Sequence, residues 1–184
     1  MFRARNSGYS MIEMMAVVLL VSIGSRFAVN QIKGSLNLID ADIAANTVSG
    51  QIQYARQMAI DERRNMQIDF LGSNEIKITR QDSGGGTTVK SDVTLPPGYS
   101  FALPAGFSTD TPEGFGNTDP VYFNGGTSGL FLADGTFVSA VNVLINGTVF
   151  TKGSGNQTSR AVTLTASTGR VKTYWIVGSA WALR

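Results

Sequence analysis

The feature that most constrains this chain of 184 residues is a long apolar run close to its N-terminus. Over residues 9–24 the only ionisable side chains are those of Tyr9 and Glu13. Sixteen helical residues reach about 24 Å, somewhat less than the roughly 30 Å hydrocarbon core of a bilayer. Arg26 could extend the span by placing its charge at the interface. We therefore predict a membrane-inserted helix over residues 9–29.

An ordinary secretory signal peptide also begins with a basic segment and an apolar run, so it is the alternative for this region. Such a peptide should end in a small-residue cleavage site beyond the apolar run. Residues 25–27 read Ser-Arg-Phe and fit that pattern poorly. The sequence favours an apolar helix that stays in the protein.

The helical pattern continues beyond the apolar run and becomes amphipathic. Apolar residues recur at spacings of four, three and four, first at Ile32, Leu36, Ile39 and Ile43, and again at Val48, Ile52, Ala55 and Ala59. This periodicity is typical of a helix with one apolar face. We predict an amphipathic helix half over residues 30–64 that ends near residues 61–64. A single helix of about 50 residues would be roughly 75 Å long.

After Arg64 the periodicity changes from 3.6 to 2, which indicates β-strands. We call residues 65–184 the head. The predicted strands cover residues 66–71, 75–80, 87–95, 99–103, 121–124, 130–133, 137–138, 141–145, 161–166 and 171–177. The five prolines and most glycines fall between these segments, as expected for antiparallel strands joined by loops. The fold class is therefore α+β, with the amphipathic helix half packed on an antiparallel β-rich head.

The composition argues against an enzyme. The chain has neither cysteine nor histidine, which excludes thiolate nucleophiles, the usual Cys/His zinc sites and histidine acid–base chemistry. The glycines at 84–86 lack the Lys-Ser/Thr ending of a phosphate loop and predict a flexible linker. Asp110, Glu113 and Asp119 match no standard calcium loop, so a solvated acidic surface is the better interpretation. We expect no catalytic residue, no metal site and no cofactor.

Charge is divided unevenly along the head. Five acidic residues and no basic ones lie between residues 91 and 151, namely Asp92, Asp110, Glu113, Asp119 and Asp134. The residues after Asp134 carry only basic charge, at Lys152, Arg160, Arg170, Lys172 and Arg184. Three interpretations follow. The basic residues could be solvated strand ends, they could contact the acidic loops of another subunit, or they could bind DNA.

Positions 8–13 read GYSMIE, and this segment resembles the class III signal of type IV pilins and type II secretion pseudopilins. The resemblance implies that a prepilin peptidase cuts after Gly8, removes residues 1–8 and methylates Tyr9. It implies that Glu13 takes the place of the family's acidic residue at the fifth mature position. In lipid a carboxylate is costly unless paired, and the α-amino group of a neighbouring subunit would be a suitable cation. Ser10 and Glu13 also fit a local capping box, which is compatible with that role.

The head narrows the resemblance to the GspH/FimT family, through FLADGT at 131–136 and GRVK at 169–172. This family contains minor type IV pilins and type II secretion pseudopilins, so the resemblance implies a pilin-like fold and a non-enzymatic filament subunit acting in type IV pilus assembly. A secretion pseudopilin is the alternative. Some family members bind DNA for uptake through a basic Gly-Arg-x-Arg motif; here Lys172 replaces the second arginine, and Tyr174 and Trp175 lie nearby.

The implied partners are other pilins or pseudopilins in a helical filament, the prepilin peptidase and the inner-membrane assembly platform, with DNA as a further candidate. The implied location is the inner membrane, with a single pass and a periplasmic head, and then the filament. Arg3 and Arg5 favour a cytoplasmic leader. Three positions depart from the family pattern: Tyr9 replaces phenylalanine, Asn30 replaces a helix-kinking proline, and Arg26 is a charge unusually early in the helix.

We predict that Glu13→Ala permits leader cleavage but impairs incorporation into the filament, because the substitution removes the carboxylate that sets the register between subunits. Immunoblots of whole cells would show the shortened chain, and blots of sheared filaments would show its loss. Normal incorporation of the variant would contradict this role of Glu13.

Overall fold

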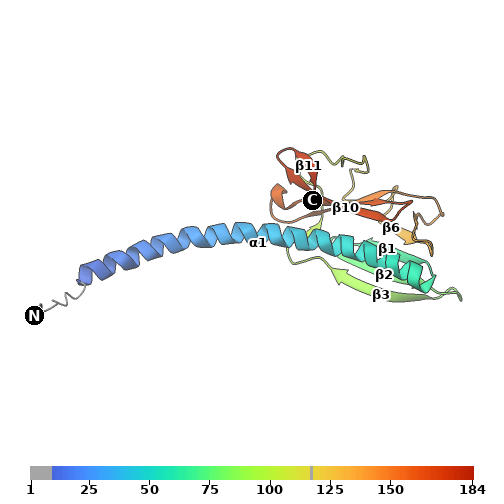
Figure 1. The fold of residues 1–184 in the computed structure, drawn as a ribbon, viewed down its shortest axis with the longest axis horizontal. Helices are drawn as coiled ribbons and strands as arrows, with labels where there is room; N and C mark the ends of the chain where they lie inside the picture. Colours follow the sequence, from blue (N-terminus) through green and yellow to red (C-terminus); the bar gives the residue numbers. More distant parts are fainter. Residues whose placement is uncertain (1–9, 117) are drawn as a thin grey trace, which may run out of the picture. The chain divides into compact units, whose positions relative to one another are not determined.

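The computed structural model describes residues 10–116 and 118–184, and the side chains of these residues except 27–33. Gly8, Tyr9 and the predicted leader lie outside the described residues. The chain forms two units, residues 1–36 and 37–184, which meet within a long helix (Figure 1). We call residues 37–184 the compact unit.

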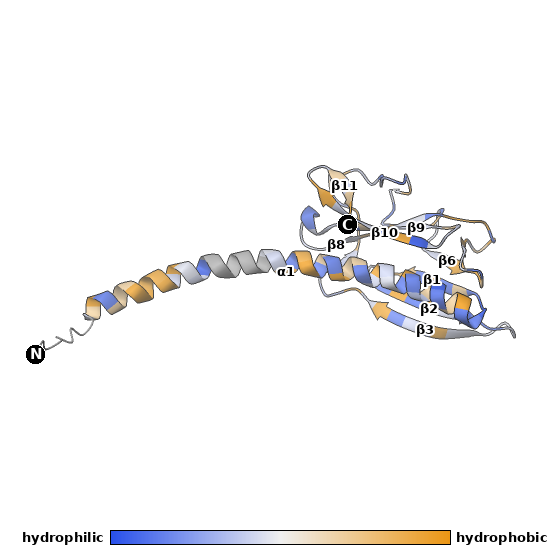
Figure 2. Cartoon of the chain, viewed as in Figure 1, coloured by the Kyte–Doolittle hydropathy of each residue, from blue (hydrophilic) through white to orange (hydrophobic). Residues whose placement is uncertain are grey.

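The helix α1 extends from Met11 to Glu62, close to the bounds that the sequence predicts. The carbonyl of Ser10 accepts the first hydrogen bonds, from the amides of Glu13 (2.9 Å) and Met14 (3.1 Å). Arg63 follows with a φ of 50°, a left-handed conformation that ends the helix. Apolar residues predominate in the first turns of α1 (Figure 2). In the part of the chain that the structure describes, no helix combines the length and apolar composition needed to cross a membrane.

Small residues form the face of α1 that packs within the compact unit. The buried helix residues are Ala41, Ala44, Ala45, Val48, Ile52, Ala55 and Ala59. The later half of the predicted apolar row is therefore confirmed. In the earlier half, Ile39 is 53% exposed and Ile43 is 46% exposed, so these two residues do not form a buried face. The side chain of Ile32 lies outside the described residues. The alanines leave room for larger core side chains from the sheets, and Ile39 and Ile43 face outward.

The head contains two antiparallel sheets. The first has the order β3-β2-β1-β6-β7 and the second the order β11-β10-β9-β8-β4, with β5 also paired to β8. The strands of the first sheet are β1 (Met66–Leu71), β2 (Glu75–Gln81), β3 (Thr87–Thr94), β6 (Ser128–Phe131) and β7 (Phe137–Val138). Those of the second are β4 (Ser100–Phe101), β5 (Val121–Tyr122), β8 (Gly147–Lys152), β9 (Arg160–Thr165), β10 (Arg170–Val177) and β11 (Ala180–Leu183). A short 3₁₀ helix, η1 (Asn156–Thr158), precedes β9.

The sequence misplaces one strand and misses two. Residues 141–145 alternate in polarity, yet they form a loop with a single bridge from Leu144 to Val138, and Val141 is 79% exposed. The true strand is β8, which shows no alternation because five consecutive residues of it are buried. One face of the second sheet joins the main core, and Phe150, Ala161 and Tyr174 form a separate cluster. A strand buried on both faces lacks the period-2 signal. The terminal strand β11 is the other omission.

The helix and both sheets share one hydrophobic core with a run of phenylalanines at its centre. Phe137 lies between Phe123 and Phe131, with ring centroids 5.2 and 4.7 Å away. Gly129 of β6 gives this ring its space, since a Cβ built there would lie 2.1 Å from Cζ of Phe137. The ring is fully buried, so it cannot move outward.

We predict that Gly129→Ala destabilises the protein by about 1–3 kcal/mol, the usual cost of inserting a methyl group into a packed core. Urea denaturation followed by tryptophan fluorescence measures the change. Gly126→Ala is the matched control, because the nearest atom to a Cβ there is 3.8 Å away. Equal stability of the two variants would contradict the packing argument.

Candidate assembly surface

The first part of α1 presents large apolar side chains that no other described residue covers. Met11 is 83% exposed, and the others that are at least half exposed are Ile12, Met14, Met15, Val17, Val18, Leu19, Leu20, Val21 and Ile23. Leaving such a side chain in water instead of burying it costs about 1.5–3 kcal/mol each. A surface of this kind indicates contact with lipid or with other apolar helices.

Glu13 lies in the first turn of α1 and its side chain is exposed. The backbone carbonyl of Ser10 starts the helix, but within the described residues neither side chain of the Ser10–Glu13 pair makes a capping hydrogen bond. The carboxylate is therefore available to a group outside the chain. It also lies where an anion is favoured by the helix dipole.

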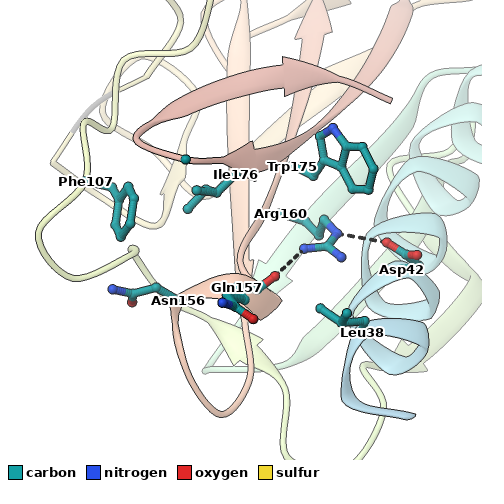
Figure 3. Close-up of a pocket in the computed structure, with 9 residues that line it drawn as sticks. Leu38, Asp42, Phe107, Asn156, Gln157, Arg160, Trp175 and Ile176 are labelled. Atoms are coloured by element: carbon teal, nitrogen blue, oxygen red, sulfur yellow. Dashed lines mark hydrogen bonds and ion pairs between the residues drawn. The ribbon is translucent and has the colours of Figure 1, made fainter. Parts of the chain in front are cut away.

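The structure separates the four basic residues that the sequence groups together. Arg160 is buried, with only 2% of its surface exposed. Its Nε donates to Oδ1 of Asp42 at 2.8 Å, and its Nη1 donates to the carbonyls of Gln157 and Ser159 at 2.9 Å (Figure 3). The same Asp42 oxygen also accepts an ion pair from Arg184 at 2.6 Å. Arg160 therefore connects β9 to α1 and does not belong to a basic surface.

Lys172 is also engaged within the chain. Its Nζ lies 2.7 Å from Oε1 of Glu113, and the hydroxyl of Tyr174 donates to the same oxygen. Burial alone would raise the pKa of the Glu113 carboxyl. The hydrogen bonds from Lys172 and Tyr174, the charge of Lys172 and a hydrogen bond from Thr163 act against burial, and the pKa lies below its ordinary value. Burial and the bond to Glu113 raise the pKa of Tyr174. Glu113 belongs to the loop that carries Asp110 and Asp119, which we call the acidic loop, and this loop thus contacts β10 within one molecule.

Lys152 and Arg170 lie at opposite ends of the second sheet. Thr151 pairs with Arg160, which pairs with Trp175, whereas Arg170 pairs with Thr165 at the other end. Five residues along a strand correspond to about 17 Å. The two residues therefore do not form one basic patch.

Arg170 instead lies beside Arg56 of α1, which sequence reasoning did not single out. The two line a polar notch of about 330 Å³, which we call the basic notch, together with Gln53, Gln57, Gly169 and Val171. The Nε of Arg56 donates to the carbonyl of Gly135 at 3.2 Å, and a Cβ at Gly169 would lie 2.3 Å from that Nε. The two sequence segments that carry the GspH/FimT resemblance therefore meet around Arg56. The sequence did contain one signal for Arg56: it directly follows Ala55, a residue of the predicted apolar row, so it lies beside the face of α1 that packs on the head.

A second, larger pocket of about 430 Å³ lies between α1, η1 and β10 (Figure 3). Leu38, Phe107, Trp175 and Ile176 contribute apolar walls. Its charged groups, Asp42 and Arg160, are already paired with each other. Among the described residues no three acidic side chains come together in a way that could hold a metal ion.

The pair formed by Glu113 and Lys172 makes stability depend on pH. A carboxyl whose pKa is lowered by folding contributes stability above its unfolded pKa, about 4.5 here, and loses it as the pH falls through the folded value. We predict that Glu113→Gln costs about 1–3 kcal/mol at neutral pH and much less in acid. Denaturation at both pH values tests this. Asp110→Asn, on the exposed part of the same loop, is the control and should cost nothing; an equal loss at both pH values would contradict the linkage.

Comparison with known proteins finds no matching family model and no matching curated protein. Two solved structures are similar. The minor pseudopilin EpsH of the Vibrio cholerae type 2 secretion system has 11% identity and a TM-score of 0.50, over 74% of this chain and 97% of that one. The type IV minor pilin FimU of Pseudomonas aeruginosa has 16% identity and a TM-score of 0.51, over 82% of this chain and 96% of that one. The α+β prediction and the pilin resemblance are confirmed at the level of fold: the chain has the fold shared by type IV pilins and pseudopilins.

Proposed function

We propose that the chain is a non-enzymatic structural subunit of a type IV pilus and acts as a minor pilin in its assembly. The observation that carries this proposal is the exposed apolar surface of α1 over residues 11–26, in a chain whose compact unit has a hydrophobic core of its own. Such a segment needs a partner that is itself apolar. Like helices in the core of a filament supply one.

The polar groups of this segment are compatible with an apolar environment. The hydroxyls of Ser22 and Ser25 donate to the carbonyls of Val18 and Val21, each at 2.7 Å. They are therefore satisfied without water, as burial requires. Glu13 is the exception and needs a cation from outside the chain. The new α-amino group of a neighbouring subunit would meet that need.

The compact unit has exposed apolar side chains of its own on α1, at Ile39 and Ile43. These side chains are four residues apart and therefore occupy one face of the helix. They are about half exposed, whereas the alanines around them pack inward. A neighbouring helix that packs along α1 would bury them.

Before assembly, the proposal places the chain in the inner membrane with the head in the periplasm and the leader in the cytoplasm. Cleavage after Gly8 by the prepilin peptidase, methylation of Tyr9 and contact with the assembly platform belong to the same proposal. They rest on the sequence resemblance.

A type II secretion pseudopilin is the alternative, and similarity to EpsH and to FimU supports a pilin-like subunit in either system. DNA binding through the C-terminal basic residues receives less support. Arg160 is buried, Lys172 is paired with Glu113, and Lys152 lies at the far end of the sheet from Arg170.

Deletion of the gene, followed by complementation, tests the function. We predict that the deletion strain loses most surface pili, counted by electron microscopy, and that the wild-type gene restores them. The variant carrying Ile39→Glu and Ile43→Glu should fold but fail to restore pili, because the charges would be buried between subunits. Val141→Glu is the control at an exposed apolar loop residue and should restore them fully. Normal pili in the deletion strain would contradict the pilus role and favour the secretion alternative.

A further inference from the structure

The basic notch holds two guanidinium groups that have no ion-pair partner within the described residues. Ion pairs engage Arg80, Lys90, Arg160, Lys172 and Arg184 elsewhere in the compact unit. Arg56 and Arg170 form no ion pair within the described residues, and Arg170 is exposed. Two unpaired cations at one notch leave a net positive charge there.

Arg56 is fixed in place by the turns on either side of it. Its Nε donates to the carbonyl of Gly135, and a Cβ built at Gly169 would lie 2.3 Å from the same Nε. Both glycines have positive φ, 82° and 61°. The Nη atoms of Arg56 are left for another acceptor. Because an arginine presents its donors in a planar fork, a carboxylate can bind them in a bidentate way.

We infer that the basic notch binds an exposed carboxylate of a neighbouring subunit, and that the acidic loop of a second copy supplies it through Asp110 or Asp119. This inference rests on the proposed filament role. Both aspartates are exposed and form no ion pair within the described residues, whereas Glu113 of the same loop is used internally. They belong to the stretch between residues 91 and 151 that has no basic residue.

A single carboxylate fits these charges better than a polyanion does. Residues 37–184 carry 12 acidic and 11 basic side chains, so the compact unit does not attract nucleic acid as a whole. Most of the basic side chains near the second sheet are already paired, and tracking a phosphate backbone requires a row of free cations. The notch offers two.

Zero-length cross-linking tests the inference on the full chain in sheared filaments. A carbodiimide joins an amine directly to a carboxylate in contact with it, but it does not couple a guanidinium. Arg170→Lys keeps the positive charge and adds a reactive amine. We expect a covalent dimer in which mass spectrometry joins position 170 to Asp110 or Asp119, and we expect the dimer to be lost when both aspartates are replaced by asparagine.

Three controls make the result specific. The unsubstituted chain should give no dimer through position 170. Arg64→Lys adds an amine at an exposed position outside the notch and should give none through Asp110 or Asp119. The contacts of Lys172 with Glu113 and of Lys90 with Glu62, both 2.7 Å, should couple within each chain and show that the reagent works.

The other outcomes distinguish a failure of the notch inference from a failure of the proposed function. If Arg170→Lys filaments contain the chain but the amine couples to no other subunit, the notch inference is wrong and the proposed function stands. Coupling to a different pilin overturns the second-copy assignment, and competition by duplex DNA assigns the notch to nucleic acid instead. If the wild-type chain is absent from filaments, both proposals fail.

Discussion

In the compact unit, α1 packs an alanine-rich face against the side chains of both sheets, and together they form one hydrophobic core. Five fully buried alanines form most of the inward face of the helix, with Val48 and Ile52 as its larger members. Small side chains leave room for the bulky residues of the sheets, so the phenylalanines of the core can lie beneath the helix. The same arrangement turns Ile39 and Ile43 outward. The orientation of α1 therefore buries the alanines in the core and leaves Ile39 and Ile43 exposed to a neighbouring subunit.

The packing of α1 on the sheets also brings charged side chains of the helix and the strands together. Asp42 lies one position after Ala41 on the helix, near enough to β9 to bind the buried Arg160. Removing one partner of a buried ion pair generally costs more than the pair contributes, because the other charge is left unpaired. Glu62 performs a similar role at the end of α1, where hydrogen bonds from Arg80 and then Lys90 lower the pKa of its carboxyl. These acidic residues of α1 thus pair with basic residues of the head within one molecule.

The parts of the fold that the sequence predicts are those with a local signal. The hairpin of β1 and β2 follows from alternation and a turn, and the helix bounds follow from periodicity. By contrast, β8 is hidden because burial on both faces removes its alternation, and residues 141–145 show alternation without forming a strand. Among the candidate site residues, no local pattern distinguishes Arg160, which is buried, from Arg170, which is exposed. That difference arises from long-range contacts: Arg160 lies 118 residues from Asp42 in the chain.

The two glycine turns show why a sequence resemblance can have a structural rather than a chemical basis. Gly135 and Gly169 lie far apart in the chain, yet both adopt positive φ beside the same arginine. A side chain at Gly169 would collide with Arg56, and one at Gly135 would also crowd Ile60. The positive φ favours glycine at both turns, whatever the notch binds. Because the same packing holds Arg56 beside Arg170, the fold places on the compact unit two cations that have no ion-pair partner within the described residues.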